Sequence, residues 1–229
     1  MTTVSENLRA AQARVEAAAR RAGRSPDGVR LMAVTKGFPR ETVLEALSAG
    51  AVLFGENRVQ EAETKYAGLE DRCETHLIGH LQTNKARAAA ALFRCVQSID
   101  SVHTAQALSA RCSELGRSLD VLLELNTSGE ASKSGFPGPE DLRAAAGVIE
   151  TLPGLTVRGL MTVGPLTEDA VRIRSSFALL RSVFESLRAG RAQFDILSMG
   201  MSSDFEIAVE EGATLVRLGT ALFGPRAPR

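Results

Sequence analysis

Short apolar runs rich in β-branched residues alternate along the chain with longer segments in which apolar residues recur every three or four positions. The short runs are typical of buried strands, and the longer segments are typical of helices that cover a sheet with one face. Their alternation indicates βα units around a parallel sheet, which is the α/β fold class. The predicted strands are residues 29–35, 51–55, 75–79, 94–100, 120–126, 155–161, 194–200 and 214–219.

Eight strands are the number that closes a (β/α)8 barrel of the TIM type, and we predict one such barrel. A segment with Val4, Leu8 and Ala11 at helical spacing precedes the first strand, and Thr3 with Glu6 forms a capping box. This segment predicts an extra N-terminal helix on the outside of the barrel. The alternative is an open doubly wound sheet, but no GxGxxG sequence follows the first strand.

No stretch of the chain has the composition of a linker between domains, and 229 residues suit one large core better than two small ones. We therefore expect residues 1–229 to form a single domain. Lys and Arg together number 27, as do Asp and Glu, so no excess of positive charge indicates a nucleic acid as partner.

No apolar stretch reaches the length of about 18 residues that indicates a transmembrane helix, and polar residues follow Met1, so neither a membrane span nor a secretory leader is expected. Cys73, Cys95 and Cys112 are odd in number and widely spaced, which fits reduced thiols in a cytoplasmic protein better than a disulfide framework. We expect buried thiols that act as small apolar side chains rather than as nucleophiles.

In a barrel of this type the functional residues lie at the carboxyl ends of the strands. Lys36 directly follows the first predicted strand, and the chain then turns through Gly37 and Pro39. Lysine is rare in this chain, whereas arginine, which cannot form an imine, carries most of the positive charge. Lys36 is either a surface charge or an amine placed for chemistry. The four lysines are Lys36, Lys65, Lys85 and Lys133.

Two late segments have the composition of a phosphate site: SMGMSSDFE from Ser198 and VRLGTALFG from Val216. Glycines allow a close approach of the backbone to an anion, and hydroxyl groups donate hydrogen bonds to it. Both segments fall at the seventh and eighth strands, where barrels commonly bind phosphate. The alternative is that these residues only form turns.

A phosphate site opposite a lysine is the arrangement that pyridoxal 5′-phosphate needs, because the lysine forms a Schiff base and the phosphate anchors the cofactor. Arg217, on the eighth strand, is the candidate to face the pyridine nitrogen. Arginine only donates hydrogen bonds, so it would leave that nitrogen largely unprotonated and weaken the electron sink.

The chain resembles the pyridoxal phosphate homeostasis protein family over nearly its whole length. This resemblance implies a barrel like the N-terminal domain of alanine racemase, with Lys36 as the Schiff-base lysine. The matching pieces are AVTK ending at Lys36, FGENRVQEA from Phe54, HLIGHLQTNK from His76, Ile99-Asp100, the segment from Asn126 through ASKSGF, RGLMTV from Arg158, and SMGMSSDFEIAVEEGATLVRLGTALFG from Ser198.

The resemblance also implies the roles of single residues. Arg217 would face the pyridine nitrogen, Asn57 would lie near the ring, and Lys133 would take part in cofactor exchange. The chain departs from some members at Phe38, where a second lysine can stand, and at Thr75, where an aromatic residue is frequent. The residues implied to hold the phosphate are Ser198, Ser202, Gly219 and Thr220.

The resemblance implies a protein that holds the cofactor and delivers it to apo forms of pyridoxal-phosphate-dependent enzymes, with little or no catalysis of its own. The alternative is a pyridoxal-phosphate-dependent amino-acid racemase. A two-base racemase needs a second acid–base group, usually a tyrosine brought by an additional β domain. We expect no such domain, because the chain stops at Arg229 just after the eighth strand, and we expect a monomer. The single tyrosine, Tyr66, is expected to be a half-buried aromatic residue in a helix.

A metal site is the remaining alternative, because His76 and His80 are four residues apart. On a helix that spacing would let both rings bind one zinc ion, but HLIGH reads as a strand that runs into a glycine turn. We therefore expect no metal. The QTNK segment from Gln82 leaves two possibilities open for Asn84 and Lys85, namely the cofactor side of the barrel or a partner.

Overall fold

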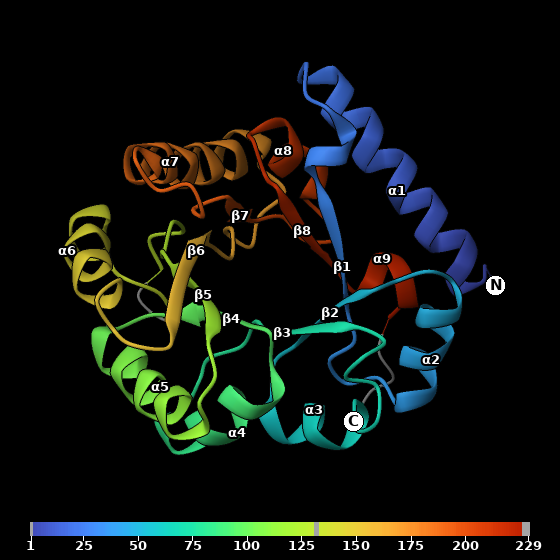
Figure 1. Cartoon of the computed structure of the whole chain (residues 1–229). Helices are drawn as coiled ribbons and strands as arrows, with labels where there is room; N and C mark the ends of the chain where they lie inside the picture. Colours follow the sequence, from blue (N-terminus) through green and yellow to red (C-terminus); the bar gives the residue numbers. More distant parts are fainter. Residues whose placement is uncertain (1, 131–132, 226–229) are drawn as a thin grey trace.

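Eight parallel strands close into a barrel in their order along the chain in the computed structural model (Figure 1), which describes residues 2–130 and 133–225. The predicted (β/α)8 architecture is confirmed. The strands are β1 (Arg30–Val34), β2 (Leu53–Glu56), β3 (Glu74–Leu77), β4 (Cys95–Ile99), β5 (Leu119–Glu124), β6 (Leu155–Met161), β7 (Ile196–Ser198) and β8 (Leu215–Leu218).

Helices form a ring around the barrel (Figure 1). They are α1 (Val4–Arg21), α2 (Arg40–Ser48), α3 (Val59–Lys65), α4 (Ala86–Leu92), α5 (Val102–Leu115), α6 (Pro139–Ile149), α7 (Ala170–Arg188), α8 (Phe205–Glu210) and α9 (Thr220–Phe223), with 3-10 turns η1 (Pro26–Gly28) and η2 (Thr83–Lys85).

The extra helix α1 begins with the predicted capping box, in which Thr3 and Glu6 each bond the backbone of the other. Its apolar face is buried, and the helix packs on the outside of the barrel against α8 and α9. The Asn7 side chain donates to the carbonyl oxygen of Leu222 at 2.9 Å, and Arg14 pairs with Glu206 at 3.0 Å. The prediction of an outer N-terminal helix is therefore confirmed.

Alternation of side chains along the strands separates two apolar regions. Met32, Leu53 and Leu215 pack together inside the barrel, whereas Phe54 and Phe177 belong to the larger core between the barrel and the helices. Each such side chain contributes about 1.5–3 kcal/mol when it is fully buried. Because the strands are covered on both faces, they read in the sequence as continuous apolar runs.

Two local predictions were wrong. The seventh strand is shorter than predicted and ends at Ser198, because the chain turns at Gly200 with a φ of +92°. Tyr66 is not half-buried: it caps α3 and is only 2% exposed. Its ring packs edge-on against Phe54 at 5.8 Å, so the space between α3 and the barrel wall encloses it.

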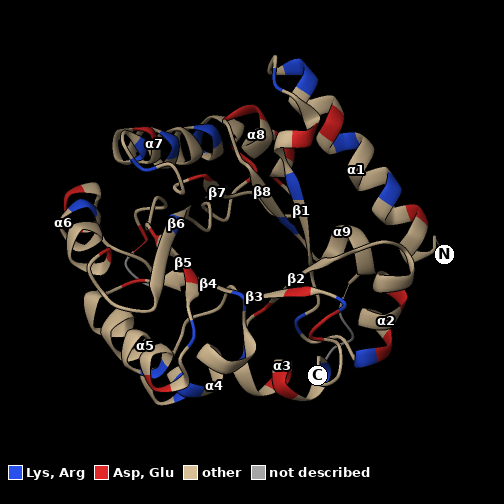
Figure 2. Cartoon of the chain, in the orientation of Figure 1, with Lys and Arg blue, Asp and Glu red and all other residues tan. Residues whose placement is uncertain are grey.

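Charged residues of both signs are interspersed around the ring of helices (Figure 2). On α7, Arg172, Arg174, Arg181 and Arg188 are exposed, while Phe177, Leu180 and Phe184 face the core. Within the described residues, no helix combines the length and the apolar character needed to cross a bilayer.

Gly159 provides a test of how tightly β6 and β7 approach each other. Its φ is +152°, and an added Cβ atom would lie 1.8 Å from the carbonyl oxygen of Ile196. We expect Gly159→Ala to lower the free energy of unfolding by about 3 kcal/mol, because the two backbones must separate. Urea denaturation followed by circular dichroism measures this change.

Gly147→Ala is the matched control, because Gly147 lies on the exposed side of α6 with nothing within 4 Å of the new atom. This change should raise the free energy of unfolding by about 0.5–1 kcal/mol. Equal midpoints for the two variants would contradict the close approach at Gly159.

Candidate functional site

Lys36 lies two residues past the end of β1, at the carboxyl end of the barrel. Met32 and Val34 point into the barrel, and Lys36 is partly buried in the turn that follows them. The chain turns immediately after it: Phe38 N–H donates to the carbonyl oxygen of Thr35 at 3.0 Å, and Gly37 has a φ of +75°. The turn explains why glycine follows the lysine, since this conformation strains other residues.

The backbone on each side of Lys36 is held by charged side chains of α3. The Lys65 ammonium donates to the carbonyl oxygen of Thr35 at 2.7 Å, and Gly37 N–H donates to Glu61 Oε1 at 2.6 Å. Lys65 itself lies between Glu56 and Glu61, at 2.7 Å from each carboxylate. The end of β1 is therefore fixed by an ion triad from β2 and α3.

Glu56, at the end of β2, is fully buried on the outer side of the barrel wall. Its Oε1 accepts hydrogen bonds from Lys65 and from the Thr35 hydroxyl, each at 2.7 Å. Its Oε2 has no hydrogen-bond partner among the described residues. Burial raises the pKa of Glu56, and the contacts with Lys65 and Thr35 oppose that rise.

Arg217 lies on β8 and is 4% exposed inside the barrel. Its guanidinium donates to the hydroxyl of Ser198 and to the carbonyl oxygen of Thr162, both at 2.7 Å. Burial lowers the pKa of Arg217 to about 10, while Glu124 and Asp204 act to raise it. Arg217 is therefore charged at neutral pH and acts only as a donor.

Glu124, at the end of β5, is a second buried carboxyl group at this end of the barrel. Burial raises the pKa of Glu124 to about 7; the charge of Arg217 lowers it and that of Asp100 raises it further. This carboxyl group therefore gains and loses a proton near neutrality.

The loops after β7 and β8 converge at the start of α9. The Ser202 hydroxyl accepts from Gly219 N–H at 3.3 Å and from Ala221 N–H at 3.1 Å. Thr220, the first residue of α9, is exposed beside them. The N–H groups of Gly219 and Ala221 thus point at one position, where the Ser202 hydroxyl oxygen accepts from both.

The residues that the sequence singled out come from four strands and lie at one end of the barrel. Lys36 follows β1, Asn57 follows β2, Ser198 ends β7 and Arg217 lies on β8, with Ser202, Gly219 and Thr220 in the loops after the last two strands. The loop of Asn57 also packs tightly on that of Gly79, where an added Cβ would lie 2.4 Å from the Asn57 carbonyl oxygen.

The remaining sequence features are Lys133, the two spaced histidines and the QTNK segment. Lys133 donates to the carbonyl oxygen of Gly164 and pairs with Glu130, each at 2.9 Å. Residues 131 and 132 of the ASKSGF segment lie outside the described residues. His76 is buried in the barrel, whereas His80 is exposed and contacts Asp100 at 2.9 Å. Asn84 lines a polar pocket of about 710 Å³ near the ends of β3 and β4.

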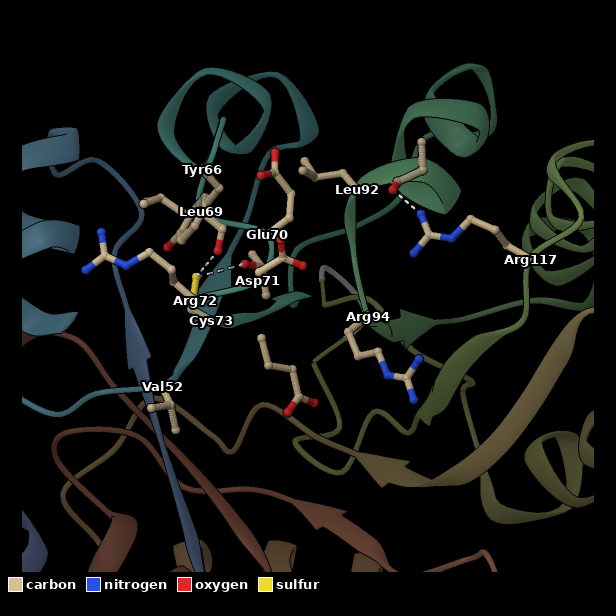
Figure 3. A pocket seen from close by; sticks show the side chains of 13 residues that line it. Val52, Tyr66, Leu69, Glu70, Asp71, Arg72, Cys73, Leu92, Arg94 and Arg117 are labelled. Atoms are coloured by element: carbon tan, nitrogen blue, oxygen red, sulfur yellow. Dashed lines mark hydrogen bonds between the residues drawn. The ribbon is translucent and has the colours of Figure 1, made fainter.

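A further pocket of about 660 Å³ lies at the opposite, amino-terminal end of the barrel (Figure 3). It is lined by residues that precede β2, β3, β4 and β5, among them Val52, Cys73, Arg94 and Arg117. The labelled side chains do not converge on a common point in Figure 3. The pocket therefore stands apart from the residues at the carboxyl ends of the strands.

Sequence reasoning missed the Glu56–Lys65 pair and Glu124. The signal for Glu124 was present, because a carboxylate that ends an apolar strand at the carboxyl end of a barrel is a candidate functional group. No periodic pattern indicated that Lys65 is buried, since lysine in a helix is usually exposed.

The ion triad predicts that Lys65→Met destabilises the fold. Without the ammonium group, the carboxylate of Glu56 is buried with no compensating charge, and we expect a loss of about 3–5 kcal/mol in the free energy of unfolding. Lys85→Met, at a partly exposed lysine of η2, is the control and should change it by about 0.5 kcal/mol or less. Denaturant titration of both variants measures this; a loss below about 1 kcal/mol for Lys65→Met would contradict the role of the triad.

Glu124 predicts a pH dependence of stability. Its folded pKa of about 7 exceeds the ordinary value of 4.5, so between these values the native state binds a proton that the unfolded state releases. The free energy of unfolding therefore falls as the pH rises through this window. Relative to wild type, Glu124→Gln should gain on the order of 3 kcal/mol between pH 4 and pH 8.

Denaturant titrations at a series of pH values test this, with Glu140→Gln as control at a carboxyl group that is 91% exposed. A stability difference between Glu124→Gln and wild type that stays flat over this range would show that folding does not raise the pKa of Glu124.

Comparison with known proteins gives concordant results. The family model of the alanine racemase N-terminal domain matches residues 7–227. The pyridoxal phosphate homeostasis protein of Pseudomonas aeruginosa is 46% identical over 227 residues, which cover 99% of this chain and 97% of that protein. The corresponding protein of Escherichia coli is 39% identical over 231 residues, or 99% and 98% of the two chains.

Among solved structures, PipY of Synechococcus elongatus with bound PLP has a TM-score of 0.82 and 39% identity, and the match covers 97% of this chain and 100% of that chain. Alanine racemase of Clostridium difficile shares the fold, with a TM-score of 0.75 at 15% identity, and the match covers 57% of its length. With a barrel of the alanine racemase type, full-length matches and this arrangement of residues at its carboxyl end, the chain belongs to the pyridoxal phosphate homeostasis protein family.

Proposed function

We propose that this protein binds pyridoxal 5′-phosphate as a Schiff base on Lys36 and serves the homeostasis and delivery of the cofactor inside the cell, with little or no catalysis. The relatives named above and the PLP-bound PipY structure support binding of the cofactor. The observation that carries the proposal is the position of Lys36, on an anchored strand end at the same end of the barrel as a buried arginine and the Ser202 loop.

The donor set at this end of the barrel fits the cofactor. Pyridoxal phosphate brings an aldehyde, which condenses with an amine with loss of water, a phosphate, and a pyridine nitrogen that accepts hydrogen bonds. The chain offers the amine of Lys36 and the guanidinium of Arg217, and we assign the phosphate to Ser202, Gly219 and Thr220. We place Asn57 beside the ring because its loop follows the strand next to β1.

Ser198 has a different role in this proposal from the one that the sequence indicated. Its hydroxyl is fully buried and accepts a hydrogen bond from Arg217 at 2.7 Å. We therefore assign the side chain of Ser198 to the orientation of Arg217 rather than to the phosphate.

Arg217 also supports the expectation of little catalysis. A carboxylate at this position would accept a proton shared with the pyridine nitrogen, whereas a charged guanidinium donates to it. The ring then withdraws electrons less strongly from a bound amine. Holding the cofactor, rather than stabilising a carbanion, suits this environment.

The racemase alternative needs a proton-transferring group besides Lys36. Tyr66, the single tyrosine, does not serve, because its hydroxyl is buried against the Thr35 hydroxyl at 2.6 Å on the outer side of the barrel wall. Burial and the charge of Glu56 raise the pKa of Tyr66 further. No described contact favours racemisation over cofactor binding.

The first test is the visible absorption spectrum of the protein incubated with pyridoxal phosphate, followed by borohydride reduction and peptide mapping. We expect an imine band and a reduced adduct on Lys36, both missing from Lys36→Ala, because Lys65, Lys85 and Lys133 do not lie directly after a barrel strand. Lys85→Ala is the control and should keep both signals. A wild-type protein that stays colourless and unmodified would refute the proposal.

The same loaded protein then tests delivery and catalysis. Mixed with an apo form of a pyridoxal-phosphate-dependent enzyme, it should restore activity faster than the same concentration of free cofactor. Racemisation of alanine at about 1 per second or faster would instead favour the racemase.

A further inference from the structure

A chain of hydrogen-bonded side chains runs through the interior of the barrel from Arg217 toward the amino-terminal end. The Ser198 hydroxyl contacts Gln97 Oε1 at 2.7 Å, and Gln97 Nε2 contacts His76 Nδ1 at 2.7 Å. His76 Nε2 contacts Glu74 Oε1 at 2.6 Å, and the other oxygen of Glu74 accepts from Arg30 at 2.6 Å. Ser198, Gln97 and His76 are each no more than 1% exposed.

The two ends of this chain fix the direction of every hydrogen bond. Arg217 is charged and can only donate, so the Ser198 oxygen accepts from it, and the single hydroxyl proton points to Gln97 Oε1. The amide of Gln97 then presents its N–H group to His76 Nδ1, which must accept. The remaining ring proton of His76 lies on Nε2 and is donated to Glu74.

This arrangement requires a neutral His76. A proton on Nδ1 would face the N–H group of Gln97, donor against donor. Turning the amide over would remove Gln97 Oε1 as the acceptor for the buried Ser198 hydroxyl proton, which costs free energy. Burial lowers the pKa of His76, while Glu74 acts to raise it. The geometry and the direction of this shift agree.

We propose that Gln97 and His76 are positioning residues that hold the guanidinium of Arg217 in place through Ser198. This inference rests on the proposed function, in which Arg217 faces the pyridine nitrogen of the cofactor. Arginine is long and loses considerable rotamer freedom when fixed, and the described contacts of Arg217 are with Ser198 and the Thr162 carbonyl. Gln97 Oε1 accepts the hydrogen bond from the Ser198 hydroxyl, so a lone pair of the Ser198 oxygen is directed at the guanidinium.

The first experiment determines the direction of these hydrogen bonds in the wild-type protein by locating the ring proton of His76. Nitrogen-15 NMR of the imidazole rings distinguishes the two neutral tautomers from the charged form, and only three histidines are present. His76→Asn assigns the resonances. We expect neutral His76 with its proton on Nε2 at pH 7. A proton on Nδ1, in either the other tautomer or the charged ring, would overturn the proposal.

The second experiment tests the link to Arg217. Gln97→Met keeps the approximate volume but removes the acceptor for Ser198, and we expect about tenfold weaker binding of pyridoxal phosphate together with a shifted absorption band of the bound cofactor. Ser109→Ala is the control, because it removes a buried hydrogen bond to the Pro153 carbonyl, on α5 and outside the barrel interior. A merely structural role would change stability in both variants but leave the band in place.

Gln97→Glu provides a rescue. Its carboxylate accepts from Ser198 and also from a proton on His76 Nδ1, so Arg217 keeps its contact while His76 becomes charged. Binding should return to within about threefold of wild type. The proposal fails if Gln97→Met binds with the wild-type band and affinity, or if Gln97→Glu binds as weakly as Gln97→Met. If wild type forms no adduct on Lys36, the proposed function fails instead. The tautomer of His76 still decides whether the hydrogen bonds from Ser198 to Glu74 run in the proposed direction.

Discussion

The pairing of β8 with β1 is the contact on which the candidate site depends. Four register pairs, from Arg30 with Leu215 to Ala33 with Leu218, join the last strand to the first and close the sheet. Closure brings Arg217 and the Ser202 loop to the same end of the barrel as Lys36, although they lie far apart in the sequence. A closed parallel barrel also directs the carboxyl ends of all strands to one side, so residues that follow different strands meet there.

Buried charges are concentrated around this end of the barrel. Glu56 and Lys65 contact Thr35, the residue before Lys36, on the outer side of the barrel wall. Arg217 and Glu124 lie inside the barrel. Removing such groups from water costs free energy, and an apolar residue of similar size often gives greater stability. The ion triad instead fixes the backbone on each side of Lys36, and Arg217 provides a donor of fixed charge. We interpret these groups as contributions to precise placement at some cost in stability.

The outer architecture follows largely from local sequence patterns. Apolar runs predicted all eight strands, and β6 was placed at residues 155–161 as observed. The capping box of Thr3 and Glu6 and the apolar stripe of α1 needed no tertiary information. The end of β7 could not be placed from its apolar run, because the turn at Gly200 depends on the packing of α8. An added Cβ on Gly200 would lie 2.5 Å from Ala208 of that helix. Burial of Tyr66 likewise depends on the space between α3 and Phe54.

The sequence alone determined which residues are available for chemistry: a rare lysine after a buried strand, an arginine on the last strand, and hydroxyl and glycine residues beside it. Periodicity and residue type are local properties, so they identify these groups without reference to the rest of the chain. Only the tertiary structure decided what each group contacts. It placed the Ser198 hydroxyl on Arg217 and Gln97, buried Lys65 beneath Thr35, and connected His76 to Glu74. These contacts join different strands and helices, and burial and hydrogen-bond partners are properties of the packed barrel that no local pattern contains.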